Sequence, residues 1–306
     1  MSRTTPPRTV DVAAVFPQLA PLARTATRLH PRPGSPTPHD SSVGGPFLWP
    51  ADEPWPYCQE VHEWHDGRVD DWYAGWHEGP NAMLPLVQLY VRDVPQLRPP
   101  GKADLLQLLW CPCEHPPEHK PPTALFWRSS TEVTDILATP PETIEVEYDE
   151  YVPKPCALTP EQITEYPNLL ELTEQLRRDL EDWIRWQAAG SGVDSSYAPH
   201  PEAFYTNELS VAPGWKVGGW PPWGLTDPIA RFCSMCDARM TPLLTISSNE
   251  WDSSNHGWIP YEDRALADIP KAGVTNSPRV QVSRGNHLQL YVCPTSPDHP
   301  HTDLIQ

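Results

Sequence analysis

The seven residues LQLYVCP at positions 288–294 have a close counterpart in LQLLWCP at positions 106–112. Both are short apolar runs of strand length that end at Cys-Pro. A carboxylate-His-Pro triplet follows each of them, at 114–116 and at 298–300. This agreement predicts that two parts of the chain are built on one common frame.

Further shared features occur in the same order in both parts. They are Val-Gly-Gly at 43–45 and 217–219, a cysteine at 58 and 233, and an apolar run at 83–87 and 240–244. The spacing between them differs, as it would if loops had been inserted into a shared frame. The sequence therefore predicts two similar β-sheet repeats, at 41–128 and 206–301.

The remaining segments complete a predicted α+β fold that is dominated by β-structure. Residues 129–205 are expected to bridge the repeats and to contain an amphipathic helix at about 168–189, where leucines recur at helical spacing. A Thr-Pro-Glu-Gln sequence at 159–162 predicts a further helix start. Acidic and apolar residues alternate at 143–152, which is typical of a half-exposed strand. Residues 1–40 are expected to form a tail, a short helix at 18–29 and a proline-rich connector.

Composition and charge narrow the class of protein. The chain has 306 residues, 14 tryptophans and 41 prolines, which indicates a folded core with short elements. Its net charge of -18 argues against non-specific nucleic-acid binding, which needs clustered Lys and Arg, and suits a basic partner. No apolar stretch predicts a signal peptide or a membrane span. We therefore expect a cytoplasmic protein with no membrane partner.

The second repeat carries the clearest metal motif. Seven cysteines without a secretion signal indicate metal ligation and free thiols more than a disulfide framework. Cys233-x-x-Cys236 has the spacing of a zinc knuckle. Cys293 and His299 would complete a structural Zn²⁺ site, with His301 as an alternative to His299. The competing interpretation is a set of buried thiols and surface histidines.

The first repeat contains a candidate second metal site. Val61 stands where a partner cysteine of Cys58 would be expected, so this repeat departs from the knuckle pattern. A dense cluster follows the strand that ends at Trp110, with His62 and His119 as further histidines nearby. The candidate ligands are Cys58, Cys111, Cys113 and His115.

Function is less clearly indicated than metal binding. No G-x-S-x-G, P-loop or dinucleotide-binding motif is present, which favours a non-enzymatic protein- or peptide-binding module. Trp49, Trp220 and Trp223 are candidates for an exposed partner-binding surface, although packing of tryptophan against proline in turns is the simpler explanation. The alternative function is a metal-dependent hydrolase or nucleic-acid-processing enzyme, which would need an open metal position.

The Gly-Gly-x-x-x-Trp-Pro sequence, the Leu-Gln-Leu strand and the paired halves resemble the bacterial YwqG-like family of domain-of-unknown-function proteins over roughly residues 40–301. Residues 217–221 with Cys233-x-x-Cys236 are also distantly similar to eukaryotic programmed cell death protein two and its yeast relative in ribosome maturation. The resemblance implies a duplicated domain and a chaperone-like role toward a basic client, by analogy of fold alone.

Overall fold

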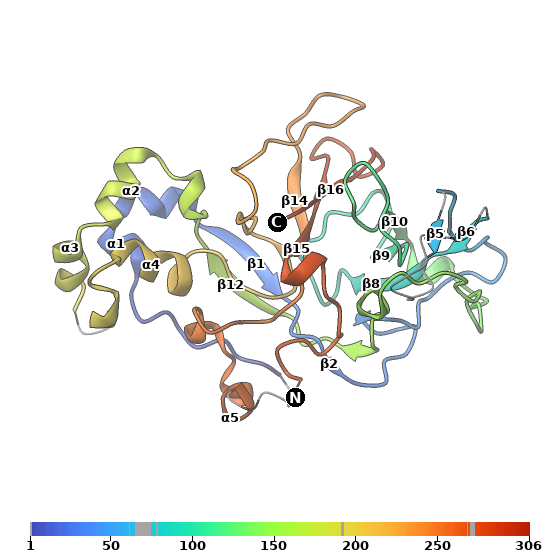
Figure 1. The fold of residues 1–306 in the computed structure, drawn as a ribbon, viewed down its shortest axis with the longest axis horizontal. Coiled ribbons are helices and arrows are strands. Elements are labelled where there is room, and N and C mark those ends of the chain that lie inside the picture. Colours follow the sequence, from blue (N-terminus) through green and yellow to red (C-terminus); the bar gives the residue numbers. More distant parts are fainter. Residues whose placement is uncertain are drawn as a thin grey trace. The chain divides into compact units, whose positions relative to one another are not determined.

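The computed structural model describes residues 2–60, 62–64, 75–77, 79–190, 193–267, 269 and 273–306 (Figure 1). The chain forms two compact units. Unit 1 comprises Met1–His30, Thr159–Thr275 and Asn286–Gln306, and unit 2 comprises Pro31–Leu158 and Asn276–Gly285. The segment 129–205, expected to bridge two repeats, is thus divided between the units after residue 158.

Unit 1 is built on a six-stranded antiparallel sheet within the described residues. Its strands, in order across the sheet, are β12 (Glu161–Glu165), β1 (Arg24–Arg28), β13 (Lys216–Gly218), β14 (Thr241–Ser247), β15 (His287–Val292) and β16 (Thr302–Ile305). The apolar residues of β14 and β15 are buried, and their pairing shifts register between Pro242 and Leu244. A proline in the strand cannot donate a ladder hydrogen bond, which explains an irregularity at this point.

Unit 2 also contains a six-stranded antiparallel sheet in its described part. The order is β10 (Thr123–Arg128), β9 (Leu105–Trp110), β8 (Leu84–Tyr90), β3 (Ser42–Val43), β11 (Cys156–Ala157) and β2 (Arg32–Pro33). Two short ladders accompany it, β4 (Tyr57–Cys58) with β7 (Asn81–Ala82) and β5 (His62–Trp64) with β6 (Gly75–His77). The pairing of β8 with β9 shifts register between Pro85 and Val87.

The two sheets have the same order of elements. In each, a short strand at a Gly-Gly pair lies beside a long strand with a proline-associated bulge, followed by the Leu-Gln-Leu strand and one further strand. The glutamine of the Leu-Gln-Leu strand bonds the residue opposite in both cases. Gln107 Nε2 donates to Gln88 Oε1 at 2.8 Å, and Thr245 Oγ1 donates to Gln289 Oε1 at 2.6 Å. The prediction of a β-dominated α+β fold is confirmed.

A helical cluster belongs to unit 1 and appears beside β1 and β12 in Figure 1. Its elements are α1 (Val12–Val15), α2 (Glu174–Leu180), α3 (Trp183–Ala188) and α4 (Pro201–Phe204), and α5 (Arg264–Ala267) lies further along the chain. Phe16 and Trp186 meet edge to face at 4.8 Å in its core. The N-terminal segment, expected to be a loose tail, therefore contributes buried packing.

Three local predictions are wrong, each for a physical reason. The helix expected at 168–189 is interrupted, because Asp182 caps α3 by accepting from the Ile184 N–H at 3.0 Å. Residues 24–28 form β1 instead of part of a helix, and 161–165 form β12 instead of a helix turn. These two strands pair along their full length, a long-range contact that overrides local propensity.

A buried ion pair joins strands of the unit 1 sheet to the Gly-Gly turn. Lys216 Nζ lies 2.6 Å from Glu165 Oε1, and neither side chain is exposed to solvent. The carboxylate also accepts from the backbone N–H groups of Ala212 and Trp220, each at 2.8 Å. Gly219 has φ 71°, and a Cβ there would lie 2.1 Å from Glu165 Oε2. The second glycine is therefore required for the carboxylate to fit.

Candidate metal centres

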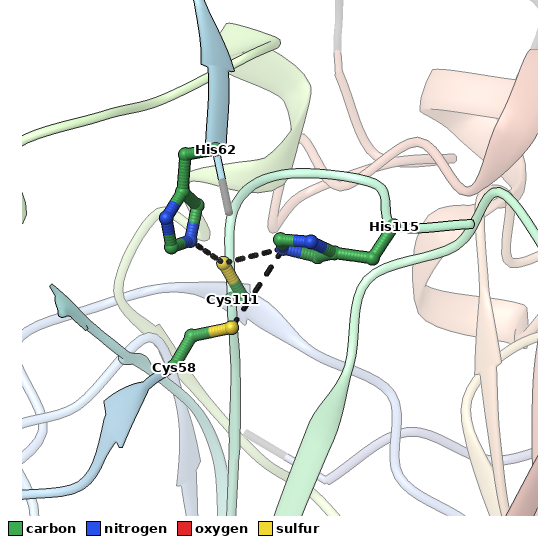
Figure 2. Close-up of side chains that lie close together, drawn as sticks. All are labelled: Cys58, His62, Cys111 and His115. Atoms are coloured by element: carbon green, nitrogen blue, oxygen red, sulfur yellow. Dashed lines mark hydrogen bonds between the residues drawn. The ribbon is translucent and has the colours of Figure 1, made fainter. Parts of the chain in front are cut away.

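Site 1 lies in unit 2, where the ends of several short elements meet (Figure 2). It consists of Cys58, His62, Cys111 and His115. Cys58 ends β4, His62 begins β5, Cys111 directly follows β9, and His115 lies on the turn closed by its bridge to Lys120. All four residues are buried, and their potential ligand atoms lie within 4.8 Å of one another.

The distances in site 1 match those expected around one metal ion. Cys58 Sγ lies 3.7 Å from His115 Nε2, and Cys111 Sγ lies 3.3 Å from His62 Nε2 and 3.5 Å from His115 Nε2. Tetrahedral Zn²⁺ with bonds of about 2.0 to 2.3 Å places its ligand atoms roughly 3.3 to 3.8 Å apart. Figure 2 shows the four side chains pointing toward a common centre.

Electrostatics in site 1 favour a cation. The adjacent Cys111 thiol, followed by His115, lowers the pKa of Cys58 to about 4. Conversely, the neighbouring Cys113 and Cys58 raise the pKa of Cys111. Thiolates this close repel one another, so they cannot all be ionised without a positive charge between them. A divalent metal would supply that charge and let both cysteine ligands bind as thiolates.

Cys113, expected to be a ligand, contacts Cys111 but is not one of the four clustered ligand residues. Its Sγ lies 3.6 Å from the Glu145 carbonyl oxygen and 4.0 Å from Asn81 Nδ2. His62 supplies the fourth ligand atom instead, four residues after Cys58. Val61, the position where a cysteine was expected, lies outside the described residues. The predicted first repeat therefore still brings four potential ligand atoms together. A Cys-x-x-x-His spacing replaces Cys-x-x-Cys, and this spacing is the signal that could have identified His62.

Site 2 lies in unit 1 and consists of the four residues expected from the sequence, Cys233, Cys236, Cys293 and His299. Their potential ligand atoms lie within 4.8 Å of one another. Cys233 Sγ is 3.4 Å from His299 Nδ1, and Cys236 Sγ is 3.5 Å from Cys293 Sγ. Both separations lie within the range expected around tetrahedral Zn²⁺.

Local backbone geometry prepares site 2 for a metal. The Cys233–Cys236 turn closes with a bond from the Asp237 N–H to the Cys233 carbonyl, and the Met235 N–H points to Cys233 Sγ at 3.4 Å. Desolvation opposes ionisation of Cys293, but the backbone N–H groups of Ser296 and Thr295 lower its pKa to about 6. Donors aimed at a sulfur stabilise the thiolate, which is the form that binds metals.

The two sites occupy corresponding places. In each, one cysteine directly follows the Leu-Gln-Leu strand, Cys111 after β9 and Cys293 after β15. A histidine follows that cysteine on the next turn, and a cysteine with a second ligand comes from the loop after the Gly-Gly pair. None of the seven cysteines forms a disulfide, and Cys156, which belongs to neither site, is buried in β11.

The tryptophans that were expected to form an exposed partner-binding surface are buried or half-buried. Trp49 is only 1% exposed and Trp223 only 8%. Trp49 packs in the apolar cluster that includes Cys58 and Cys111, and Trp223 packs in the one that includes Cys233 and Cys293. Both tryptophans are buried because they pack against the cysteines of the two sites. Trp220 is half-buried, with its indole N–H donating to the Leu22 carbonyl at 3.0 Å.

Neither a scan against models of protein families nor a search of curated proteins finds a match for this chain. The similarity to the YwqG-like family thus stays a prediction from the motifs. Within the part of the chain that the structure describes, no helix is long and apolar enough to cross a bilayer.

Proposed function

We propose that the protein is a non-catalytic, chaperone-like binding module for a basic protein or peptide, held in shape by two structural Zn²⁺ ions. The observation that carries the metal part is the presence of four Cys and His ligand atoms in each site. Cys and His together suit Zn²⁺, and four protein ligands leave no position for a reactive water. Such closed sites support a structural role more than the hydrolase alternative, which needs an open position.

A surface beside site 1 supports binding of a basic partner. Residues 142–150, here called the acidic ridge, have the sequence ETIEVEYDE. The strand expected at 143–152 does not form, and Asp149–Tyr151 form a 3-10 helix instead. The predicted alternation is present, but its apolar side faces outward. Ile144 is 62% exposed, Val146 39% and Tyr148 49%. Exposed apolar side chains in a row mark an interaction surface more often than a solvated one.

Polar contacts fix the inner side of the acidic ridge. Asn81 Oδ1 accepts from the Ile144 and Glu145 N–H groups, and Asn81 Nδ2 donates to the Glu145 carbonyl at 2.8 Å. The Glu147 N–H donates to the Pro112 carbonyl at 3.1 Å, next to the metal ligand Cys111. The metal site and the ridge therefore share a scaffold. A rigid, acidic and partly apolar surface suits a client with Lys or Arg among apolar residues.

The acidic ridge gives the first test of the proposed function. Changing Glu142 and Glu150 to Lys should reduce capture of basic proteins from a cell extract at least about tenfold, since each reversal turns attraction into repulsion. Capture by the wild type should weaken as salt rises, because exposed charges are screened. Quantitative mass spectrometry of the captured proteins provides the measurement.

A matched variant makes this test specific. Glu174 and Glu181 are exposed acidic residues of unit 1, far along the chain from the ridge. Changing both to Lys alters net charge by the same amount and should leave capture unchanged. Equal loss with both pairs would show that only net charge matters. No enrichment of any basic protein by the wild type would refute the binding function.

The common order of strands, the matching bulges and the corresponding ligand positions support a second proposal. We infer that units 1 and 2 arose by internal duplication, with the Cys-x-x-Cys pair of one copy replaced by Cys-x-x-x-His in the other. The free cysteines fit a reducing compartment such as the cytoplasm.

A further inference from the structure

Unit 1 contains a pocket of about 370 Å³ beside site 2. This volume falls at the lower end of the range of roughly 300 to 1,000 Å³ that is typical of ligand pockets. Trp223, Met240 and Tyr291 form part of its wall and pack in the same apolar cluster as the site 2 cysteines. The loop between Trp223 and Met240 carries two site 2 ligands and also lines the pocket.

Three buried polar atoms at this pocket make no hydrogen bond with the rest of the described structure, although the Glu171 carboxylate and the Trp223 indole interact with each other. They are Glu171 Oε2, the Trp223 indole Nε1 and the Tyr291 hydroxyl. Trp223 and Tyr291 are 8% and 4% exposed, so solvent contributes little to satisfying them. Leaving a buried polar group unpaired costs roughly 1 to 3 kcal/mol, and native proteins rarely do so without a function. The unpaired Tyr291 hydroxyl, beside a carboxylate that can accept further hydrogen bonds, therefore points to a ligand.

The pocket is lined by charged side chains of both signs, and the positively charged ones are in excess. Arg24, Arg231 and Arg239 line it, against the single carboxylate of Glu171. Arg24 stacks on the Trp220 ring at 3.3 Å from its centroid, and Arg231 donates to the Asp303 carbonyl at 2.9 Å. Arg239 is exposed, and its side chain makes no hydrogen bond or ion pair with the described residues. Only the electrostatic attraction of the Glu171 carboxylate acts on its guanidinium, which leaves its N–H groups open to a bound anion.

These groups define the chemistry of the ligand. Guanidinium groups bind a carboxylate or a phosphate well. A phosphate offers mainly acceptor oxygens, so it would leave the Glu171 oxygen unpaired and add repulsion. A ligand that carries a carboxylate, and an N–H group on the neighbouring carbon, can bind both the guanidinium groups and the Glu171 carboxylate. The apolar wall formed by Trp223, Met240 and Pro242 suits an aliphatic side chain. Amino acids and the C-terminal residues of peptides have this combination.

We propose that the pocket binds the carboxylate of an amino acid or of a peptide C-terminus, with Arg24 and Arg239 holding the carboxylate and Glu171 accepting the adjacent N–H. The hydroxyl of Tyr291 is the remaining partner. Removing the carboxylate, or the guanidinium of Arg239, takes away a charge-assisted hydrogen bond worth about 1.5 to 3 kcal/mol, or roughly a ten- to hundredfold change in affinity.

The test is calorimetric titration of the 306-residue protein with acetyl-L-leucine as the probe. The protein is used as purified, and its metal content is measured. Binding is expected with a dissociation constant of roughly 0.1 to 1 mM, as its size allows. Acetyl-leucine amide, which lacks the carboxylate, and 4-methylpentanoate, which lacks the N–H, should each bind at least about tenfold more weakly. Titration with free leucine distinguishes the two possible ligands. Tighter binding of leucine would indicate a free amino acid, and tighter binding of acetyl-leucine would indicate the C-terminus of a peptide.

Arg239→Gln should weaken acetyl-leucine binding about tenfold or more. Arg178→Gln is the matched control, because Arg178 is an exposed arginine of unit 1 that pairs with Glu174 and does not line the pocket. Equal binding of acetyl-leucine and its amide would overturn the proposal. So would tighter binding of inorganic phosphate, or no heat from any probe at about 10 mM. The metal content reports separately on the zinc sites, so a failure of the pocket is distinguishable from a failure of the metal assignment.

Discussion

Replacing Cys233 with serine is expected to lower the zinc content from two ions per chain to one and to destabilise unit 1. Cys233 Sγ lies 3.4 Å from His299 Nδ1 and shares an apolar cluster with Trp223, Met240 and Tyr291. Losing the metal releases the loop that carries Cys233 and Cys236 from the end of β15. Structural zinc contributes as much as roughly 10 kcal/mol in small domains, and unit 1 has its own core, so we expect a loss of several kcal/mol.

The measurement combines native mass spectrometry, which counts bound ions, with urea unfolding. Cys58→Ser should also remove one ion, but from unit 2. Cys113→Ser is the matched control, since Cys113 lies close to site 1 and its Sγ is directed to the Glu145 carbonyl instead. That variant should retain two ions. Two ions in Cys233→Ser, or only one in Cys113→Ser, would contradict the assignment of ligands.

The second large effect is expected at the buried ion pair of unit 1. Glu165→Gln should lower the free energy of unfolding by about 3 to 5 kcal/mol, because it leaves the buried Lys216 ammonium without its counter-charge. Burial already lowers the pKa of Lys216, and Glu165 opposes that shift. The variant also weakens acceptance from the Trp220 N–H, so the Gly-Gly turn should loosen.

Chemical denaturation with matched variants separates this effect from surface electrostatics. The exposed pair of Arg178 with Glu174 provides the control, and Glu174→Gln should cost less than about 0.5 kcal/mol. Adding Lys216→Met to Glu165→Gln removes the buried charge and keeps an amide acceptor for the Ala212 and Trp220 N–H groups, so the double variant should recover much of the lost stability. A loss below about 1 kcal/mol in Glu165→Gln would show that the buried charge is satisfied in another way.

The central strands of both sheets could be predicted from the sequence because their signal is local. The runs at 84–91, 105–110, 240–246 and 288–292 are apolar and short, and they form β8, β9, β14 and β15. Strands of this kind are buried on both faces, so their composition alone sets them apart. The β-dominated class followed from them.

Elements that depend on distant partners could not be predicted in this way. β1 and β12 have few apolar residues, and each is a strand because it pairs with the other. The outward direction of Ile144, Val146 and Tyr148 depends on the anchoring of the inner side by Asn81. Periodicity shows that two faces differ, but it does not show which face a neighbour covers.

The candidate sites were predictable to different degrees. Site 2 follows from a familiar cysteine spacing and from the strand end that brings Cys293 to it. For site 1 the sequence cluster included Cys113, which is only two residues from Cys111 and therefore seemed a natural ligand. The chain direction after β9 turns its Sγ toward Glu145, while the β5 ladder brings His62 to the metal position. The Cys-x-x-x-His spacing hints at His62, but the exclusion of Cys113 depends on this three-dimensional pairing.

Zinc-edge X-ray absorption of the purified protein tests the central claim most directly, because it reports the atoms bonded to the metal. Site 1 offers two sulfur and two nitrogen ligands, and site 2 offers three sulfur and one nitrogen. The account therefore predicts a mixed shell with more sulfur than nitrogen, at Zn–S distances of about 2.3 Å and Zn–N distances of about 2.0 Å. A shell of oxygen and nitrogen alone, or a purified protein with no zinc edge, would contradict it.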